Sequence, residues 1–101
     1  MSSFTDSIIQ NFENENTGYK LINEGNLFYV EIEFNKIKGF IKLSDRAKEL
    51  FITIYKKHNG AQGIDYKIKW IPKKVIEHKE HLEVHFNNKD WLHWLPNGEW
   101  Y

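Results

Sequence analysis

Apolar residues alternate with polar ones along two neighbouring stretches in the middle of the chain. Within residues 28–34, and again within 37–43, every second position is apolar or glycine. This period of two predicts strands that bury one face. If Asn35 and Lys36 form the turn, the register places the apolar side chains of both stretches on the same side. The pattern therefore predicts a hairpin.

A second hairpin is predicted just before the first. Residues 19–23 return through a turn at Glu24-Gly25 into the strand that begins near Asn26. In this arrangement Tyr19 and Leu21 join the core face of the sheet.

A spacing of three to four residues between apolar positions predicts two helices. The first extends from about Thr5 to Asn14, and Phe4 is expected to pack on Ile9. The second follows Ser44, whose hydroxyl can cap the first turn, and ends near Asn59-Gly60. Its apolar stripe consists of Ala47, Leu50, Phe51, Ile54 and Tyr55.

Two later stretches also alternate as half-buried strands do. One is 64–70, which Pro72 is expected to stop, and the other is 82–86. Residues 73–80 fit either a strand with a wide turn or a turn of helix. The aromatic tail after residue 90 contains a turn at 96–98.

The resulting order is helix, three strands, helix and two strands. It predicts an α+β fold in which an antiparallel sheet of about five strands carries two helices packed on one face. A chain of 101 residues has the common size of one domain. We therefore expect residues 1–101 to form a single domain.

Composition and charge exclude several classes of function. The chain has no cysteine, which excludes a disulfide framework, a thiol nucleophile and a zinc-thiolate site. Its 14 basic and 14 acidic residues cancel, whereas proteins that bind nucleic acid usually carry a basic excess. The sequence has no apolar run long enough to cross a bilayer, and its first residues lack the features of a signal peptide. We expect a cytoplasmic protein that does not bind membranes.

Histidines are the candidates for metal binding or for acid–base chemistry. The spacing of His78, His81 and His85 would place three imidazoles on one side of a helix. On the predicted strand, however, His81 and His85 lie roughly 13 Å apart, so we expect no metal and no cofactor. His93 and several lysines are also present, and an RNA-cleaving protein that uses His and Lys is one alternative. No spacing selects one pair, so we assign no catalytic residue and expect a protein that is not an enzyme.

The order helix, three strands, helix resembles the double-stranded RNA-binding domain. That family places lysines at the start of its second helix, where they reach phosphates. The matching stretch here, residues 44–48, has one acidic and two basic residues, and the chain continues well beyond the usual end of that domain. The resemblance implies RNA binding as a further alternative, which the neutral charge does not favour.

The predicted register leaves four apolar side chains on the outer face of the sheet, next to charged ones. They are Ile22, Leu27, Tyr29 and Phe40. Soluble monomers rarely expose such patches, so either another segment such as the aromatic tail covers them or they bind a partner.

The chain resembles the small cytosolic immunity proteins that bacteria pair with toxins. The resemblance lies in its size, its lack of cysteine and its aromatic, polar ending from Trp94 to Tyr101. It implies a non-enzymatic inhibitor that neutralises a cognate toxin, with nucleases as one candidate class. A phage or mobile-element inhibitor of a host enzyme is the alternative, and in both cases the partner is another protein. The residues expected to bind this partner are Tyr29, Glu31, Glu33, Phe40, Glu83, Trp94, Glu99, Trp100 and Tyr101.

Overall fold

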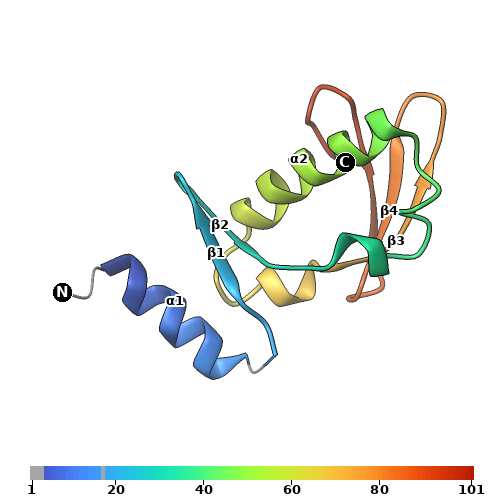
Figure 1. The fold of residues 1–101 in the computed structure, drawn as a ribbon. Helices are drawn as coiled ribbons and strands as arrows, with labels where there is room; N and C mark the ends of the chain where they lie inside the picture. Colours follow the sequence, from blue (N-terminus) through green and yellow to red (C-terminus); the bar gives the residue numbers. More distant parts are fainter. Residues whose placement is uncertain (1–3, 17) are drawn as a thin grey trace.

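The computed structural model describes residues 4–16 and 18–101, with side chains from residue 7 onward (Figure 1). In this part of the chain, two helices accompany a two-stranded and a three-stranded antiparallel sheet. The α+β class is confirmed. The single sheet of about five strands is wrong, because the strands form two separate sheets in the order helix, two strands, helix, three strands. The expected packing of Phe4 on Ile9 lies outside the described residues.

The N-terminal part combines helix α1 (Phe4–Glu15) with a hairpin of β1 (Leu21–Glu24) and β2 (Leu27–Val30). Leu21 pairs with Val30, and the register continues to Glu24 and Leu27. The two-residue turn begins at Gly25, whose φ is +64°. Hairpin turns of type II′ need a positive φ at this position, which glycine adopts readily. The first helix and this hairpin are therefore confirmed, although the turn lies at Gly25-Asn26, one residue later than predicted. Of the two expected core residues, Leu21 is buried whereas Tyr19 is 36% exposed.

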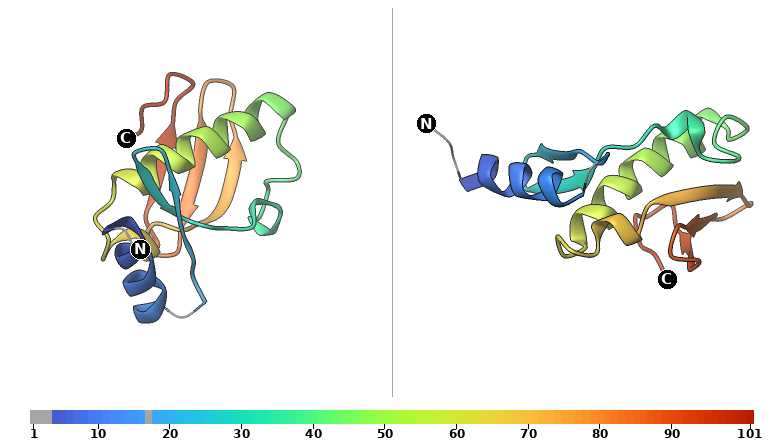
Figure 2. Two further views of the ribbon diagram at one scale, coloured as in Figure 1. Left: turned by 60° about the vertical axis from the view of Figure 1, so that its left-hand side comes forward. Right: turned by 90° about the horizontal axis from the view of Figure 1, so that it is seen from below.

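Both faces of this hairpin are apolar, and a different helix covers each of them. Leu21 and Val30 pack with Phe12 of α1 in a small hydrophobic cluster. On the opposite face, Ile22 and Tyr29 belong to the main core beneath α2 (Asp45–Ala61). Figure 2 shows the hairpin between the two helices and α2 over the C-terminal sheet. The apolar patch expected on an open outer face is therefore covered by α2.

Helix α2 begins as predicted. The hydroxyl of Ser44 accepts a hydrogen bond from the backbone N–H of Ala47. The helix extends slightly past Asn59-Gly60, and its last turn contains the buried His58. Of its predicted apolar stripe, Ala47, Phe51, Ile54 and Tyr55 are buried and Leu50 packs against them.

The predicted hairpin between residues 28–34 and 37–43 is wrong. Residues Phe34–Lys36 form a short 3-10 helix, and the backbone N–H groups of residues 37, 40 and 43 each donate to the carbonyl three residues earlier. Apolar residues therefore face the core at every third position, while Ile41 is 68% exposed. The inward-facing residues of this segment are Phe34, Ile37, Phe40 and Leu43.

Side chains occupy the edge of β2 that the predicted partner strand would have used. The N–H of Val30 donates to Asn59 Oδ1 at 2.9 Å, and its carbonyl accepts from the Tyr55 hydroxyl. The carbonyl of Phe28 accepts from Lys67 Nζ at 2.7 Å. Because these groups already have partners, β2 gains nothing from a further strand on this edge.

Residues 64–70 do not form the predicted strand either. They contain a 3-10 helix, Lys67–Lys69, and leave Ile64 and Tyr66 exposed. Lys67 is 3% exposed and turns inward, and its Nζ also contacts the carbonyls of Asn59, Gly60 and Gln62 at the end of α2. Burial lowers the pKa of Lys67 to about 8, so its ammonium keeps its proton at neutral pH.

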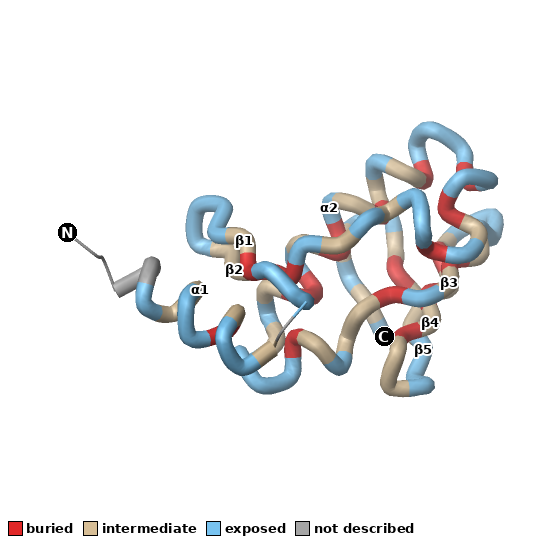
Figure 3. The backbone as a smooth tube through the Cα atoms, turned by 60° about the horizontal axis from the view of Figure 1, so that its bottom comes forward, coloured by how far each residue is buried: buried red, intermediate tan, exposed pale blue. Residues whose placement is uncertain are grey.

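The C-terminal sheet has the order β3 (Pro72–Glu77), β4 (Leu82–Phe86) and β5 (Trp91–Trp94). Pro72 begins β3 instead of ending a strand. Of the two alternatives for residues 73–80, the strand with a wide turn is therefore the correct one. Strand β4 is confirmed, with alternating buried positions that Figure 3 marks in red. The tail folds back after the turn at 96–98, and Trp100 bridges to Trp94.

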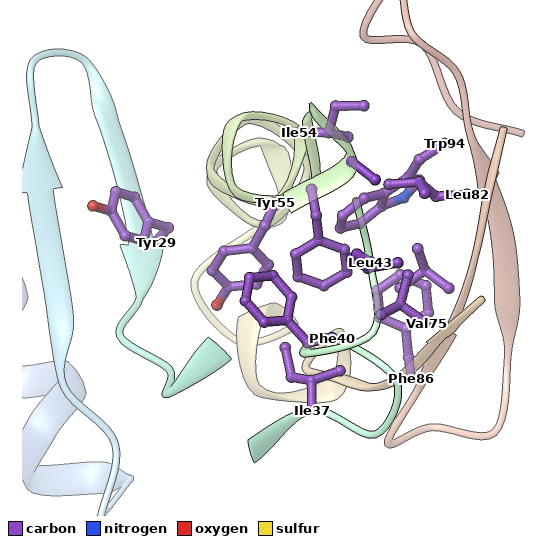
Figure 4. Close-up of a cluster of buried hydrophobic side chains, with 13 residues drawn as sticks. Tyr29, Ile37, Phe40, Leu43, Ile54, Tyr55, Val75, Leu82, Phe86 and Trp94 are labelled. Atoms are coloured by element: carbon purple, nitrogen blue, oxygen red, sulfur yellow. The ribbon is translucent and has the colours of Figure 1, made fainter. Parts of the chain in front are cut away.

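The main core lies between α2 and the inner face of this sheet (Figure 4). Val75, Val84 and Trp94 point toward Phe51 and Ile54 of the helix. Each of these five side chains is at most 2% exposed. This inner packing fixes the sheet, so alternate residues of the same strands must point away from α2.

Candidate recognition surface on the C-terminal sheet

Four of the five histidines lie on the outer face of the C-terminal sheet. Strand alternation directs His81, Glu83 and His85 away from the buried Leu82, Val84 and Phe86. In β5, His93 pairs with Glu83, and Trp91 pairs with His85. We call this surface the histidine face. It consists of His78, His81, Glu83, His85, Trp91, His93 and Tyr101.

Three imidazoles form a continuous row across this face. The rings of His78 and His81 stack with their centroids 4.6 Å apart. The ring of His93 lies 4.2 Å from that of His81, and the Tyr101 ring meets His93 edge-on at 4.8 Å. Partial burial and then the neighbouring imidazoles His93 and His78 lower the pKa of His81. His81 is therefore held in its neutral form to a lower pH than a free imidazole.

Glu83 connects the fourth imidazole, that of His85, to this row through His78. Its carboxylate accepts a hydrogen bond from His85 at 2.6 Å and another from His78 at 3.0 Å. These two hydrogen bonds, the one from His85 first, hold the pKa of Glu83 below its usual range. The carboxylate therefore orients two rings and stays ionised at neutral pH.

Two large aromatic side chains border the row of histidines. Trp91 is 52% exposed, and Tyr101 is 65% exposed. The indole of Trp91 lies 5.0 Å from the ring of His93 and stacks with His85 at 6.2 Å. Rings supported by neighbouring rings present a large contact area with little conformational freedom left to lose on binding.

The structure separates the residues predicted to bind a partner. Tyr29 and Phe40 are in the main core, and Trp94 is fully buried beneath α2. The prediction that these three residues lie on an exposed surface is therefore corrected. The hairpin of residues 28–43, which would have exposed Tyr29 and Phe40, does not form. Trp100 is partly buried, with its ring edge-on to His58 at 4.9 Å.

The predicted acidic residues fall into two groups. Glu83 is part of the histidine face, and Glu99 lies on the same side as Tyr101 because the two flank the inward-facing Trp100. Glu31 and Glu33 line a separate open groove of about 710 Å³ between the N-terminal hairpin and β3. The structure thus brings together three of the predicted residues, Glu83, Glu99 and Tyr101.

The sequence prediction missed Trp91 and the four histidines as members of one surface. The alternation in residues 81–86 already indicated that His81 and His85 share a face. What the sequence lacked was the register of β5, which places Trp91 and His93 beside them. The tail was recognised as aromatic but not as a strand.

The described residues hold no group of three or more His, Asp or Glu side chains arranged to bind a metal ion. No helix in the same part of the chain is both long enough and apolar enough to cross a membrane. Comparison of the chain with protein families, with curated protein sequences and with solved structures found no match. The geometry of the histidine face therefore carries the functional argument.

Proposed function

We propose that this chain is a non-enzymatic inhibitor that binds another protein through the histidine face, as an immunity protein binds its toxin. The observation that carries the proposal is the exposure of Trp91 and Tyr101 beside a row of histidines on an ordered sheet. Trp and Tyr are enriched among the residues that dominate binding energy at protein interfaces.

The chemistry around these two anchors supports the same proposal. Glu83 and Glu99 supply acceptors beside Trp91 and Tyr101, and the imidazoles can donate or accept hydrogen bonds. An aromatic centre with polar groups around it is the usual composition of a protein interface. The partner is a toxin or a host enzyme whose active site this face would cover.

Capture experiments with matched variants test the proposal. The wild-type chain, immobilised, should retain one protein in stoichiometric amount from its native host, and adding the chain should inhibit that protein's activity. The double variant Trp91→Ala/Tyr101→Ala should lose both effects. Tyr66→Ala is the control, because Tyr66 is 57% exposed and precedes the 3-10 helix Lys67–Lys69, outside the residues of the histidine face. Retention by the double variant, or the absence of any stoichiometric partner, would contradict the proposal.

A second candidate function is favoured by the contact between His81 and His93. Two adjacent imidazoles, one of which is held neutral, resemble the acid and base of a metal-free RNA-cleaving site. Incubation of the purified chain with RNA in a metal chelator distinguishes the two functions. Cleavage that His81→Ala abolishes would establish the enzyme, and intact RNA would remove it.

A further inference from the structure

A slot lined by lysines adjoins the histidine face at the outer edge of β3. It has a volume of about 380 Å³ and lies between residues 38–43 and β3. Its floor is apolar and includes Leu43, Val75 and Ile76, and three lysines also line it. Those lysines are Lys38, Lys42 and Lys74.

The positive charges of this slot outnumber its negative charge, because three lysines and one glutamate line it. Within the part of the chain that the structure describes, none of the three lysines has a carboxylate oxygen within 4.0 Å. The acidic residue that lines the slot, Glu77, already accepts two hydrogen bonds from Ser44 at the start of α2, both of 2.9 Å. A chain of zero net charge therefore has a local site for negative charge.

The slot and the histidine face belong to one surface. Lys38 forms a parallel bridge with Lys74, which pairs with His85, and His85 pairs with Trp91. Directly paired residues share a face of a sheet, so these four side chains form a row across it. Two ammonium groups stand at one end of the row and the exposed indole at the other. A segment that covers Trp91 and follows this row reaches the lysines.

We propose that the slot binds an extended acidic segment of the partner protein, with its carboxylates on Lys38, Lys42 and Lys74 and its aliphatic groups on the apolar floor. This inference rests on the proposed function. The apolar floor favours a peptide over nucleic acid, because a peptide brings aliphatic groups to Leu43, Val75 and Ile76, whereas a phosphate backbone has none. A partner of this kind differs from a nuclease, whose cleft carries basic groups.

Titration of the isotope-labelled chain with a short polyglutamate peptide at low ionic strength, followed by NMR, tests the slot without any partner. The expected shift changes are concentrated in residues 37–43 and 73–77. The triple variant Lys38→Gln/Lys42→Gln/Lys74→Gln should bind about tenfold more weakly or worse. The control Lys20→Gln/Lys57→Gln/Lys69→Gln removes the same charge from other exposed positions and should bind as the wild type does.

Three outcomes would overturn the inference. They are shift changes spread over all exposed lysines, equal losses in the two triple variants, and tighter binding of a short polyuridine or of inorganic phosphate than of the peptide. Failure of this titration leaves the proposed function intact, because that function is tested by Trp91 and Tyr101. Failure of the capture experiment, with the titration as expected, would contradict the proposed function and leave an acidic-peptide site.

Discussion

The ammonium group of Lys67 lies 2.7 Å from the carbonyl oxygen of Phe28, a residue 39 positions earlier in the chain. The same group contacts the Asn59 and Gln62 carbonyls at the end of α2, each at 2.9 Å. A cation at this end of a helix also interacts favourably with the helix dipole. Lys67 thus joins the N-terminal hairpin to the last turn of α2.

Replacing Lys67 by Met should destabilise the fold strongly. The substitution keeps a long side chain but leaves several buried carbonyls without their donor, at a cost of about 3 kcal/mol. Denaturant unfolding measures the loss. Lys69→Met is the control, because Lys69 is exposed and its removal should cost less than about 0.5 kcal/mol. Similar midpoints for the two variants would contradict the role of Lys67.

Stability should fall in mild acid because of His58. Its ring is enclosed by aromatic rings, among them Trp70 and Trp100, and is 1% exposed. Burial lowers the pKa of His58 from 6.5 to about 4. Between these two values the unfolded chain binds a proton that the folded chain does not, so stability is full above pH 6.5 and falls as the pH decreases toward 4.

The expected loss from this linkage is about 3 kcal/mol. Unfolding free energies of the wild type and of His58→Phe, measured across this range of pH, check it. The variant cannot take up the proton and should show a correspondingly shallower pH dependence, whatever its absolute stability. Parallel curves for the two proteins would show that His58 is not the source.

Gly39 should tolerate no side chain. Its φ of +89° disfavours other residues, and an added Cβ would overlap the carbonyl oxygen of Val75. Gly98 has the same φ, but a Cβ there would meet just the flexible end of Lys57, at 3.6 Å. Thermal or denaturant unfolding should show a loss of about 1–2 kcal/mol for Gly98→Ala and of about 3 kcal/mol or more for Gly39→Ala. Equal losses would mean that β3 does not lie against Gly39.

The row of imidazoles can be tested by titration of His81. The charge of His93 is one cause of the lowered pKa of His81, so removing His93 should raise that pKa toward its ordinary value. NMR titration of the ring protons in the wild type and in His93→Gln measures this change. An unchanged His81 titration would show that the two rings are not in contact in solution.

Local patterns were sufficient for about half of the fold. Helix α2 follows from the spacing of its apolar stripe and from Ser44, and β4 follows from strict alternation. The pattern of residues 37–43 was misleading, because apolar residues recur there at intervals of two positions and also at intervals of three. The period of three prevails because it places Phe40 and Leu43 against α2 and β3, which are distant in the sequence.

The candidate site was harder to predict for a related reason. Its members come from β4, β5, the turn between β3 and β4, and the tail, and sheet register is what brings them together. The burial of Tyr29 depends on α2 covering the hairpin, which no nearby residue indicates. Lys67 falls on the polar side of the strand predicted for residues 64–70. The carbonyl groups that bury it belong to β2 and to the end of α2, which the local pattern does not reveal. In each case the deciding contact is long-range, and neither propensity nor periodicity records it.

The central claim is that the histidine face holds a protein partner by its exposed indole. Calorimetric titration of the captured partner with the wild type, with Trp91→Ala and with Tyr66→Ala measures this most directly. An interface centred on Trp91 predicts an affinity at least about 30-fold weaker for Trp91→Ala, equivalent to about 2 kcal/mol, and no change for Tyr66→Ala. Equal affinities for the wild type and Trp91→Ala would contradict it.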